Sequence, residues 1–468
     1  MGLFMKHLFT WLLGGGLIFI LAGCKSTPPS LAHPDKPNFI VLLTDDQVYY
    51  SIEYMPILER ELIGKGINFT QGFVTTPLCC PSRASILSGQ YAHNHDVLEN
   101  RPPRGGAAKF DDTSTIATWL KQAGYRTAYI GKYLNFYDDI QPLGYVPPGW
   151  DEWHAVLDGT KPHQLYLNYT MSVNGEVVQY GTDAEDYSAD VFTAKALEFI
   201  RASKDEPFFL MIGYYNPHEP HEFAKRHNDL FRSDEEFMDK LLPNFNEEDI
   251  SDKPAWMQGL PLLEWEEMVN AYQRTVRSMQ SVDEGIAEIV KTLEQIGQRD
   301  DTLIIFISDN GLAYGEHRLS TQKNCQFEEC IRVPFVVSYP RMITTPRQDD
   351  RLVANIDIAP TLVELAGAEI PASVDGLSLA PLFSNKAEQW REALLIEHWQ
   401  LTEGFGSIIP DFFSLRTRNW KYVEYVSGEK ELYDLADDPY EMENLAYRED
   451  HAQRVKEFSA QLQSLKDQ

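Results

Sequence analysis

Cysteine is scarce in this chain, and basic residues are outnumbered by acidic ones. The 468 residues include five cysteines, too few for a disulfide scaffold, and no paired CxxC motifs of the kind that hold structural zinc. Cys325 and Cys330 could pair or remain separate thiols. The 41 lysines and arginines face 70 aspartates and glutamates, a net charge of −29. A field of that sign repels nucleic acid, so we expect no nucleic-acid partner.

The chain begins with a segment typical of bacterial export signals. Its apolar run is too short and too rich in glycine for a confident membrane span. The run ends in Leu21-Ala22-Gly23-Cys24, which resembles a bacterial lipobox. We therefore expect a signal peptide over 1–23, lipidation of Cys24 and a flexible tether over 24–36. This predicts an exported protein, lipid-anchored to a bacterial membrane on its periplasmic or cell-surface face. A plain secretory signal and an uncleaved anchor are the alternatives.

Short apolar runs alternate with helical patterns through most of the chain. Buried strands are expected at 38–44, 126–130, 208–215 and 302–308, and helices at 115–124, 189–202, 264–296 and 355–366. This alternation predicts an α/β domain over 37–388, with a large, mixed, mostly parallel sheet sandwiched by helices. Short strands with turns, followed by a helix, then predict a small α+β subdomain with an antiparallel sheet over 389–468.

Pairs of oxygen-donor side chains follow two of the predicted strands. Asp45 and Asp46 come directly after the first strand, and Asp309 and Asn310 come directly after the strand at 302–308. Ligand groups in open α/β sheets usually lie at the carboxyl ends of strands. An all-oxygen set suits a hard cation such as Ca²⁺ or Mg²⁺ better than zinc. Each pair alone could equally cap a helix.

The most informative stretch is Leu78-Cys79-Cys80-Pro81-Ser82-Arg83-Ala84-Ser85-Ile86-Leu87-Ser88-Gly89. It resembles the signature of type I sulfatases, which belong to the alkaline phosphatase-like superfamily. The resemblance implies that a formylglycine-generating or sulfatase-maturing enzyme oxidises a cysteine to formylglycine, and the spacing places Cys79 at that position. The alternative is a pair of buried thiols near a helix, which we expect to start after Pro81-Ser82.

The chemistry explains why such a nucleophile is needed. A serine or thiol would form a sulfate ester that is hard to cleave again. An aldehyde hydrate carries two hydroxyls on one carbon, so one can attack sulfur and form a covalent sulfoenzyme intermediate. The other can then lose its proton and expel sulfate, which restores the aldehyde.

The resemblance implies roles for residues outside the signature as well. The implied ligands of one divalent cation, usually Ca²⁺, are Asp45, Asp46, Asp309, Asn310 and the converted Cys79. Arg83 would hold the nucleophile, and Lys132 and Lys323 would bind sulfate oxygens and offset charge in the transition state. His218 would contact sulfate and protonate the leaving oxygen. These cations would also make the pocket locally positive in an acidic chain.

One departure narrows the resemblance. Many sulfatases read Gly-Lys-Trp-His where this chain has Gly131-Lys132-Tyr133-Leu134-Asn135. This variant and His93-Asn94-His95 resemble the branch of N-acetylglucosamine-6-sulfatases and extracellular heparan 6-O-endosulfatases. The branch implies sulfated carbohydrate as substrate, either a 6-O-sulfated hexosamine or an algal polysaccharide. The candidate substrate contacts are His93, His95, Asn135, Trp150, His221 and His317.

Two other functions stay open. Related folds use the same modified cysteine to hydrolyse phosphate or phosphonate esters. An inactive lipoprotein that kept the fold could instead bind glycans. The intact set of nucleophile, cation ligands and basic residues favours an enzyme, and a comparison of matched sulfate and phosphate esters would separate the two hydrolases.

Overall fold

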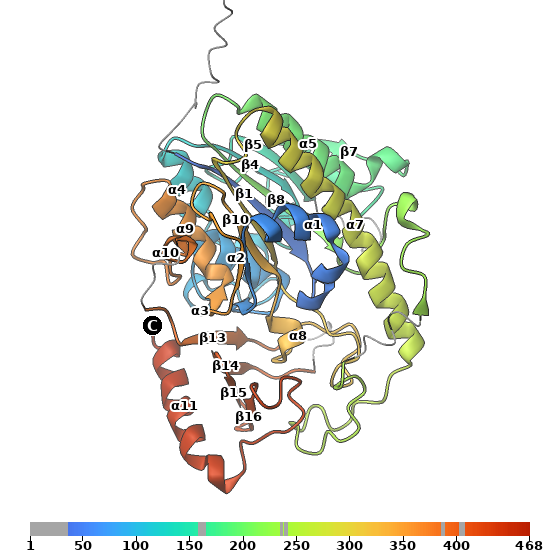
Figure 1. Ribbon diagram of the computed structural model, residues 1–468, viewed down its shortest axis with the longest axis vertical. Helices are drawn as coiled ribbons and strands as arrows, with labels where there is room; N and C mark the ends of the chain where they lie inside the picture. The colour runs from blue at the N-terminus through green and yellow to red at the C-terminus, as the bar shows by residue number, and fades with distance from the viewer. Residues whose placement is uncertain (1–35, 158–164, 235–236, 238–241, 385–388, 402–407) are drawn as a thin grey trace, which may run out of the picture. The chain divides into compact units, whose positions relative to one another are not determined.

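The computed structural model describes residues 36–157, 165–234, 237, 242–384, 389–401 and 408–468 (Figure 1). The predicted signal peptide, lipidated Cys24 and nearly all of the tether lie outside these residues. Among the helices that are described, none is both long enough and apolar enough to cross a membrane.

A ten-stranded mixed sheet forms the centre of the fold, in the order β11-β2-β10-β9-β1-β8-β4-β5-β6-β7. Its strands are β1 (Asn38–Asp45), β2 (Ile67–Phe69), β4 (Arg126–Gly131), β5 (Glu152–Leu157), β6 (Thr170–Val173), β7 (Glu176–Gln179), β8 (Phe208–Pro217), β9 (Thr302–Ser308), β10 (Phe335–Ser338) and β11 (Arg347–Asp349). Strands β9, β1, β8, β4 and β5 run parallel to one another. β10 pairs antiparallel with β9, β6 with β5, and β7 with β6. The predicted mostly parallel sheet is confirmed.

Helices cover both faces of this sheet (Figure 1). One face carries α2 (Cys79–Ser88), α4 (Ile116–Gln122), α9 (Ile358–Leu365) and α10 (Ala380–Phe383), and the other carries α1 (Pro56–Glu61), α5 (Ser188–Ala202) and α7 (Trp265–Gln295). The central strand β1 explains this arrangement. Phe39, Val41 and Leu43 pack into one hydrophobic core, while Ile40 and Leu42 pack into the other. A strand that is apolar at every position is therefore buried on both faces.

The C-terminal region forms a second, smaller sheet. β13 (Ala393–His398), β14 (Phe412–Thr417), β15 (Trp420–Tyr425) and β16 (Lys430–Asp434) pair in this order, all antiparallel. Helix α11 (Ala452–Lys466) packs on them through Phe458 and Leu462. The described residues also include β3 (Gly72–Phe73) paired with β12 (Val353–Ala354), the short helices α3 (Ala92–His95) and α8 (Glu328–Ile331), and several 3-10 turns.

Helix α2 begins earlier than the sequence suggested. It starts at Cys79 rather than after Pro81-Ser82, so the signature lies on one helix, with Leu78 and Gly89 as its two caps. Pro81 is tolerated because the first backbone N–H groups of a helix have no acceptor within the helix. The side chain of the N-cap residue, Leu78, cannot accept a hydrogen bond from the helix start. Instead, Oδ1 of Asn100, which is distant in the sequence, accepts the N–H of Cys80 at 2.9 Å.

Candidate active site

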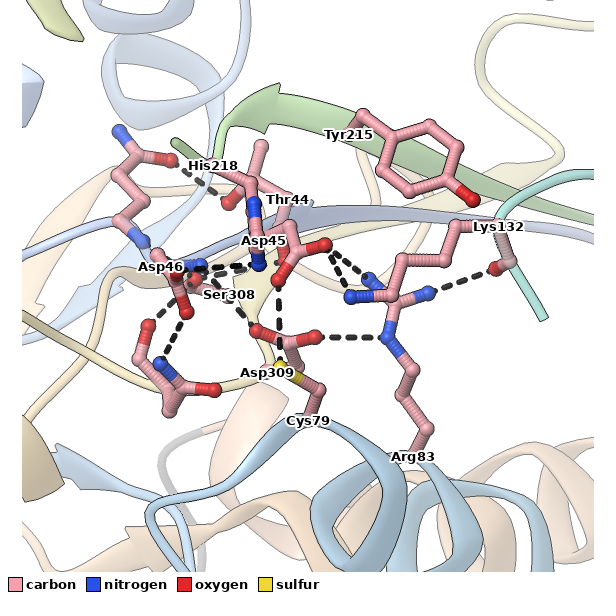
Figure 2. A network of polar contacts seen from close by, with 12 residues as sticks. Thr44, Asp45, Asp46, Cys79, Arg83, Lys132, Tyr215, His218, Ser308 and Asp309 are labelled. Carbon is pink, nitrogen blue, oxygen red and sulfur yellow. Dashed lines mark hydrogen bonds and ion pairs between the residues drawn. The ribbon is translucent and has the colours of Figure 1, made fainter. Parts of the chain in front are cut away.

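The parallel register of the central strands brings the predicted oxygen donors to one edge of the sheet. Thr44 of β1 lies opposite Ser308 of β9, so Asp45 and Asp309 leave neighbouring strands side by side. The first turn of α2 faces this edge and presents Cys79 to both carboxylates (Figure 2). The Cys79 sulfur lies 3.6 Å from Asp45 Oδ1.

These donors form a compact, buried cluster that fits a divalent cation. Ligand atoms of Asp45, Asp46, Asp309 and Cys79 lie within 4.8 Å of one another. Asn310 Nδ2 donates to Asp46 Oδ1 at 2.7 Å. Asn310 Oδ1 is buried and has no hydrogen-bond partner in the described part of the chain. Three carboxylates and an available amide oxygen are the donor set that a hard cation prefers.

Three basic side chains converge on the same cluster. Arg83 Nε donates to Asp309 Oδ2 at 2.6 Å, and Lys132 Nζ contacts Asp45 Oδ2. Lys323 Nζ lies 2.8 Å from Asp46 Oδ1 and 3.0 Å from the Cys79 sulfur. Figure 2 shows Lys132 and Arg83 approaching from one side of the carboxylates. The three basic side chains therefore offset the three carboxylates, so the site lacks the acidic excess of the chain as a whole.

The surroundings set the protonation states of the two central groups. Burial disfavours the charged form of Asp45, but Lys132 and His218 help to outweigh it and hold the pKa of Asp45 below its ordinary value. Burial raises the pKa of the Cys79 thiol to about 12, although both lysines oppose the shift. The thiolate is the nucleophilic form of cysteine, so Cys79 as encoded is a poor nucleophile near neutral pH.

His218 follows β8 and reaches the cluster from the other side. Its Nδ1 lies 2.7 Å from the carbonyl oxygen of Glu219, and its Nε2 lies 3.6 Å from Asp46 Oδ2. A carbonyl only accepts hydrogen bonds, so Nδ1 carries a proton and Nε2 is the atom that faces the site. Burial lowers the pKa of His218, while Asp45 and Asp46 oppose the shift. The side chain remains 26% exposed, which leaves it accessible to a substrate.

Two glycines allow this convergence. Gly131 and Gly213 lie opposite each other in β4 and β8. The carbonyl oxygen of Lys132 accepts hydrogen bonds from Arg83 Nη1, at 2.7 Å, and from the Tyr129 hydroxyl. A Cβ added to Gly213 would lie 2.3 Å from that oxygen. Glycine is therefore needed at 213 so that Lys132 and Arg83 can meet.

Some predicted substrate contacts lie in the core instead. Trp150 is 9% exposed and packs against Tyr129 and Phe209, with ring centroids 5.3 and 5.5 Å apart. His95 Nε2 lies 3.0 Å from Ser85 Oγ, and burial lowers the pKa of His95 to about 3. These contacts account for both residues without a sugar.

His317 belongs to a separate buried ionic network. It is fully buried, and its Nδ1 lies 2.6 Å from Glu247 Oε2. Its ring stacks on Phe327 with centroids 3.7 Å apart. Glu329 and Glu441 lie nearby, but Asn244 donates to Glu329 and Lys421 contacts Glu441. The network links the segment that carries Lys323 to the C-terminal region, and it does not reach Cys79.

The other three predicted substrate contacts, His93, Asn135 and His221, differ in burial and in hydrogen bonding. His93 Nδ1 lies 2.7 Å from Glu397 Oε1 of β13, with 22% of the His93 side chain exposed. Asn135 is half-buried, and its Oδ1 has no partner among the residues described. His221 is buried, with Nδ1 2.5 Å from the carbonyl oxygen of Pro217. His93 Nε2 and Asn135 Oδ1 are thus buried polar atoms without a hydrogen-bond partner among the described residues, while His221 braces the segment that holds His218.

Cys325 and Cys330 form a disulfide, a pairing that the sequence left open. The bridge lies two residues after Lys323 and closes a short loop that includes the start of α8. It therefore restricts the segment that presents this lysine to the cluster.

Comparisons with known proteins agree with this geometry. The Sulfatase family model matches residues 37–368, and a model described as N-sulphoglucosamine sulphohydrolase, C-terminal, matches 315–468. Human N-acetylglucosamine-6-sulfatase is 32% identical over 480 residues, which cover 92% of this chain and 84% of the human one. A putative extracellular sulfatase Sulf-1 homolog of Caenorhabditis elegans is 36% identical over 388 residues, 78% of this chain. The match spans only about half (53%) of that relative's length.

A solved structure of a protein bound to a sulfated sugar is also similar to this chain. A protein in complex with its substrate D-glucosamine-2-N,6-O-disulfate has a TM-score of 0.77 and 25% identity to this chain. The match covers 92% of this chain and 98% of that one. The chain, with its alkaline phosphatase-like fold, belongs to the sulfatase family.

Proposed function

We propose that the protein hydrolyses sulfate esters on carbohydrate, with Cys79 converted to formylglycine as the nucleophile. The observation that carries this proposal is the meeting of Cys79 with three carboxylates and three basic side chains in one buried cluster. Sulfatases in general use formylglycine and a divalent metal. The similarity to N-acetylglucosamine-6-sulfatase supports a 6-O-sulfated hexosamine as substrate, with algal polysaccharide as the second candidate.

The cation would be held by the side chains of Asp45, Asp46 and Asp309 and by Asn310 Oδ1. We propose Ca²⁺, with Mg²⁺ as the alternative, because all of these donors are oxygens. When bound, the cation supplies positive charge that stabilises negative charge developing on the sulfate oxygens.

Residues of the chain would carry out the other steps of catalysis, which are nucleophilic attack, sulfate binding and proton donation. The aldehyde hydrate supplies one hydroxyl to attack sulfur and a second to expel sulfate afterwards. Arg83 lies one turn after Cys79 on the same face of α2 and fixes the positions of Asp309 and of the Lys132 backbone. The ammonium groups of Lys132 and Lys323 bind sulfate oxygens and offset their charge. In its imidazolium form, which carries a proton on Nε2 as well as on Nδ1, His218 donates the Nε2 proton to the leaving oxygen.

A panel of defined esters tests this function. Sulfate release should be seen with N-acetylglucosamine 6-sulfate, and aryl sulfate should be preferred over matched phosphate monoesters and diesters. A strong preference for phosphate or phosphonate would overturn the proposal in favour of the related hydrolases. Matured protein that binds sulfated glycan without releasing sulfate would instead indicate a binding lipoprotein.

We also propose that the protein acts outside the cytoplasm, anchored to a bacterial membrane through lipidated Cys24. The lipobox-like residues 21–24 support the anchor, and the Cys325–Cys330 disulfide is typical of an oxidising compartment. We keep the division into a catalytic domain over 37–388 and a subdomain over 389–468 as a proposal, supported by the separate sheet that starts at Ala393.

Gly213→Ala should damage both stability and catalysis. The new methyl group would overpack against the Lys132 carbonyl, at an expected cost of about 1–3 kcal/mol in the free energy of unfolding. Because Lys132 and Arg83 would be displaced, sulfate release should fall further than the lost stability explains. Urea unfolding and kcat/KM on one sulfate ester check this. Gly259→Ala is the control, since a Cβ there meets nothing within 4 Å. Equal behaviour of the two variants would contradict the packing argument.

A further inference from the structure

We propose that Tyr166 is a positioning residue that fixes His218 for proton transfer to the leaving oxygen. This inference rests on the function proposed for His218. Tyr166 is fully buried, and its hydroxyl donates to the carbonyl oxygen of His218 at 2.5 Å. The same hydroxyl lies 3.3 Å from the carbonyl oxygen of Tyr215, at the end of β8. The Tyr166 hydroxyl therefore contacts both the end of β8 and the backbone of His218, the proposed acid.

The other contacts of His218 show why this bond matters. Its backbone N–H donates to the carbonyl oxygen of Tyr215 at 2.7 Å, and its own carbonyl also accepts the N–H of His221 at 2.9 Å. Its ring Nδ1 is held by the carbonyl of Glu219. With the backbone and Nδ1 fixed, Nε2 is the remaining polar atom of His218, and it points toward Asp46. The direction of Nε2 thus depends on the backbone position that Tyr166 holds.

Tyr166 is itself rigidly placed. Its ring stacks on Tyr187 with centroids 6.0 Å apart and an interplanar angle of 21°. Its carbonyl accepts the N–H of Ser188, the first residue of α5, at 2.9 Å. The Tyr187 hydroxyl donates to the carbonyl of Glu222 at 2.9 Å, so the two stacked rings hold both ends of the segment around His218. Burial raises the pKa of Tyr166 well above its ordinary value, which keeps the hydroxyl protonated as a donor.

The chemistry of the leaving group makes this role measurable. As the bond between sulfur and the sugar oxygen breaks, the electron pair stays on that oxygen and takes the Nε2 proton of the His218 imidazolium, which leaves a neutral ring protonated on Nδ1. A sugar alkoxide is a poor leaving group and needs this proton. A 4-nitrophenolate ion is stable without it. A misplaced His218 should therefore slow hydrolysis of sugar sulfates while leaving 4-nitrophenyl sulfate almost unaffected.

Tyr166→Phe tests the inference, because it keeps the stacked ring and removes only the hydroxyl. We expect kcat for N-acetylglucosamine 6-sulfate to fall about 10-fold with KM unchanged, a partial loss of the 10²–10⁴-fold effect of a positioned acid. Hydrolysis of 4-nitrophenyl sulfate should change less than about 2-fold, since that leaving group needs no acid. An equal loss with both substrates, or no loss with the sugar, would overturn the positioning role.

Two further variants separate the possible failures. Tyr214→Phe is the matched control, because Tyr214 is a buried tyrosine of β8 whose hydroxyl lies 3.1 Å from Thr193 Oγ1 of α5. It should lose similar stability without any change in substrate preference. His218→Ala should show the same preference as Tyr166→Phe, but more strongly. If His218→Ala slows both substrates equally, the proposed role of His218 fails. If it is selective while Tyr166→Phe is not, only the inference about Tyr166 fails.

Discussion

Cys79→Ala is expected to abolish sulfate release, with a loss in kcat of at least ~10⁴-fold, the scale seen when a covalent nucleophile is removed. The fold should survive, because alanine is a good residue for the first turn of a helix. The loss should appear with every sulfate ester, since the Cys79 position lies beside Lys323 and Asp45 rather than in a sugar-specific contact. Released sulfate and thermal unfolding, measured on the same preparation, check both expectations.

Cys80→Ala is the matched control for this substitution. Cys80 is also buried in the first turn of α2, but among the described contacts its sulfur makes none with the cluster residues. We expect its activity to stay within a few-fold of the unaltered protein. Peptide mass spectrometry should find an aldehyde at residue 79 and an unchanged thiol at residue 80. Fully active enzyme in which residue 79 is still cysteine would refute the mechanism.

Asp309→Asn is expected to lower kcat by about 10³-fold, because a bound cation contributes several kcal/mol of transition-state stabilisation. The substitution keeps the shape of the side chain but removes a charge from the cation site and from Arg83, 2.6 Å away. Bound Ca²⁺ and Mg²⁺, measured by elemental analysis, should fall together with activity. Ca²⁺ should restore the chelator-treated native protein but not the variant.

Asp283→Asn provides the comparison for this result. Asp283 is also buried, and it accepts the N–H groups of Ile57 and Leu58 at 2.9 and 2.7 Å rather than contacting the basic side chains of the cluster. This variant should lose stability while it keeps its metal content and turnover. Near-normal turnover of Asp309→Asn would show that the cation site has been placed wrongly.

The fold could be predicted where the hydrophobic pattern of a segment matches the burial of that segment in the structure. The runs that became β1, β8 and β9 are apolar at successive positions, and such strands are buried wherever a parallel sheet has helices on both faces. The donors Asp45 and Asp309 could be predicted because each directly follows such a strand. Cys79 and Arg83 could be predicted because they lie four residues apart in one linear motif.

The contacts made by distant segments could not be predicted in this way. Trp150 and His95 have the same chemistry in a core as in a sugar pocket, and only the packing of remote strands and helices decides between the two. Gly213 and Tyr166 act on Lys132 and His218, residues about 50–80 positions away in the sequence. Strand β13 is likewise not predictable from its own six residues, because it is stabilised by its pairing with β14.

The burial of Cys79 limits when its proposed conversion to formylglycine can take place. Residues 72–89 are all buried in the folded protein, and the sulfur lies in a helix turn beneath Lys323. With Cys79 only 1% exposed, a maturing enzyme would have no access to its sulfur in the folded protein. Under the proposed mechanism, conversion must therefore precede folding. Protein that has folded without the maturing enzyme should stay inactive on later exposure to it, and regain competence only after unfolding.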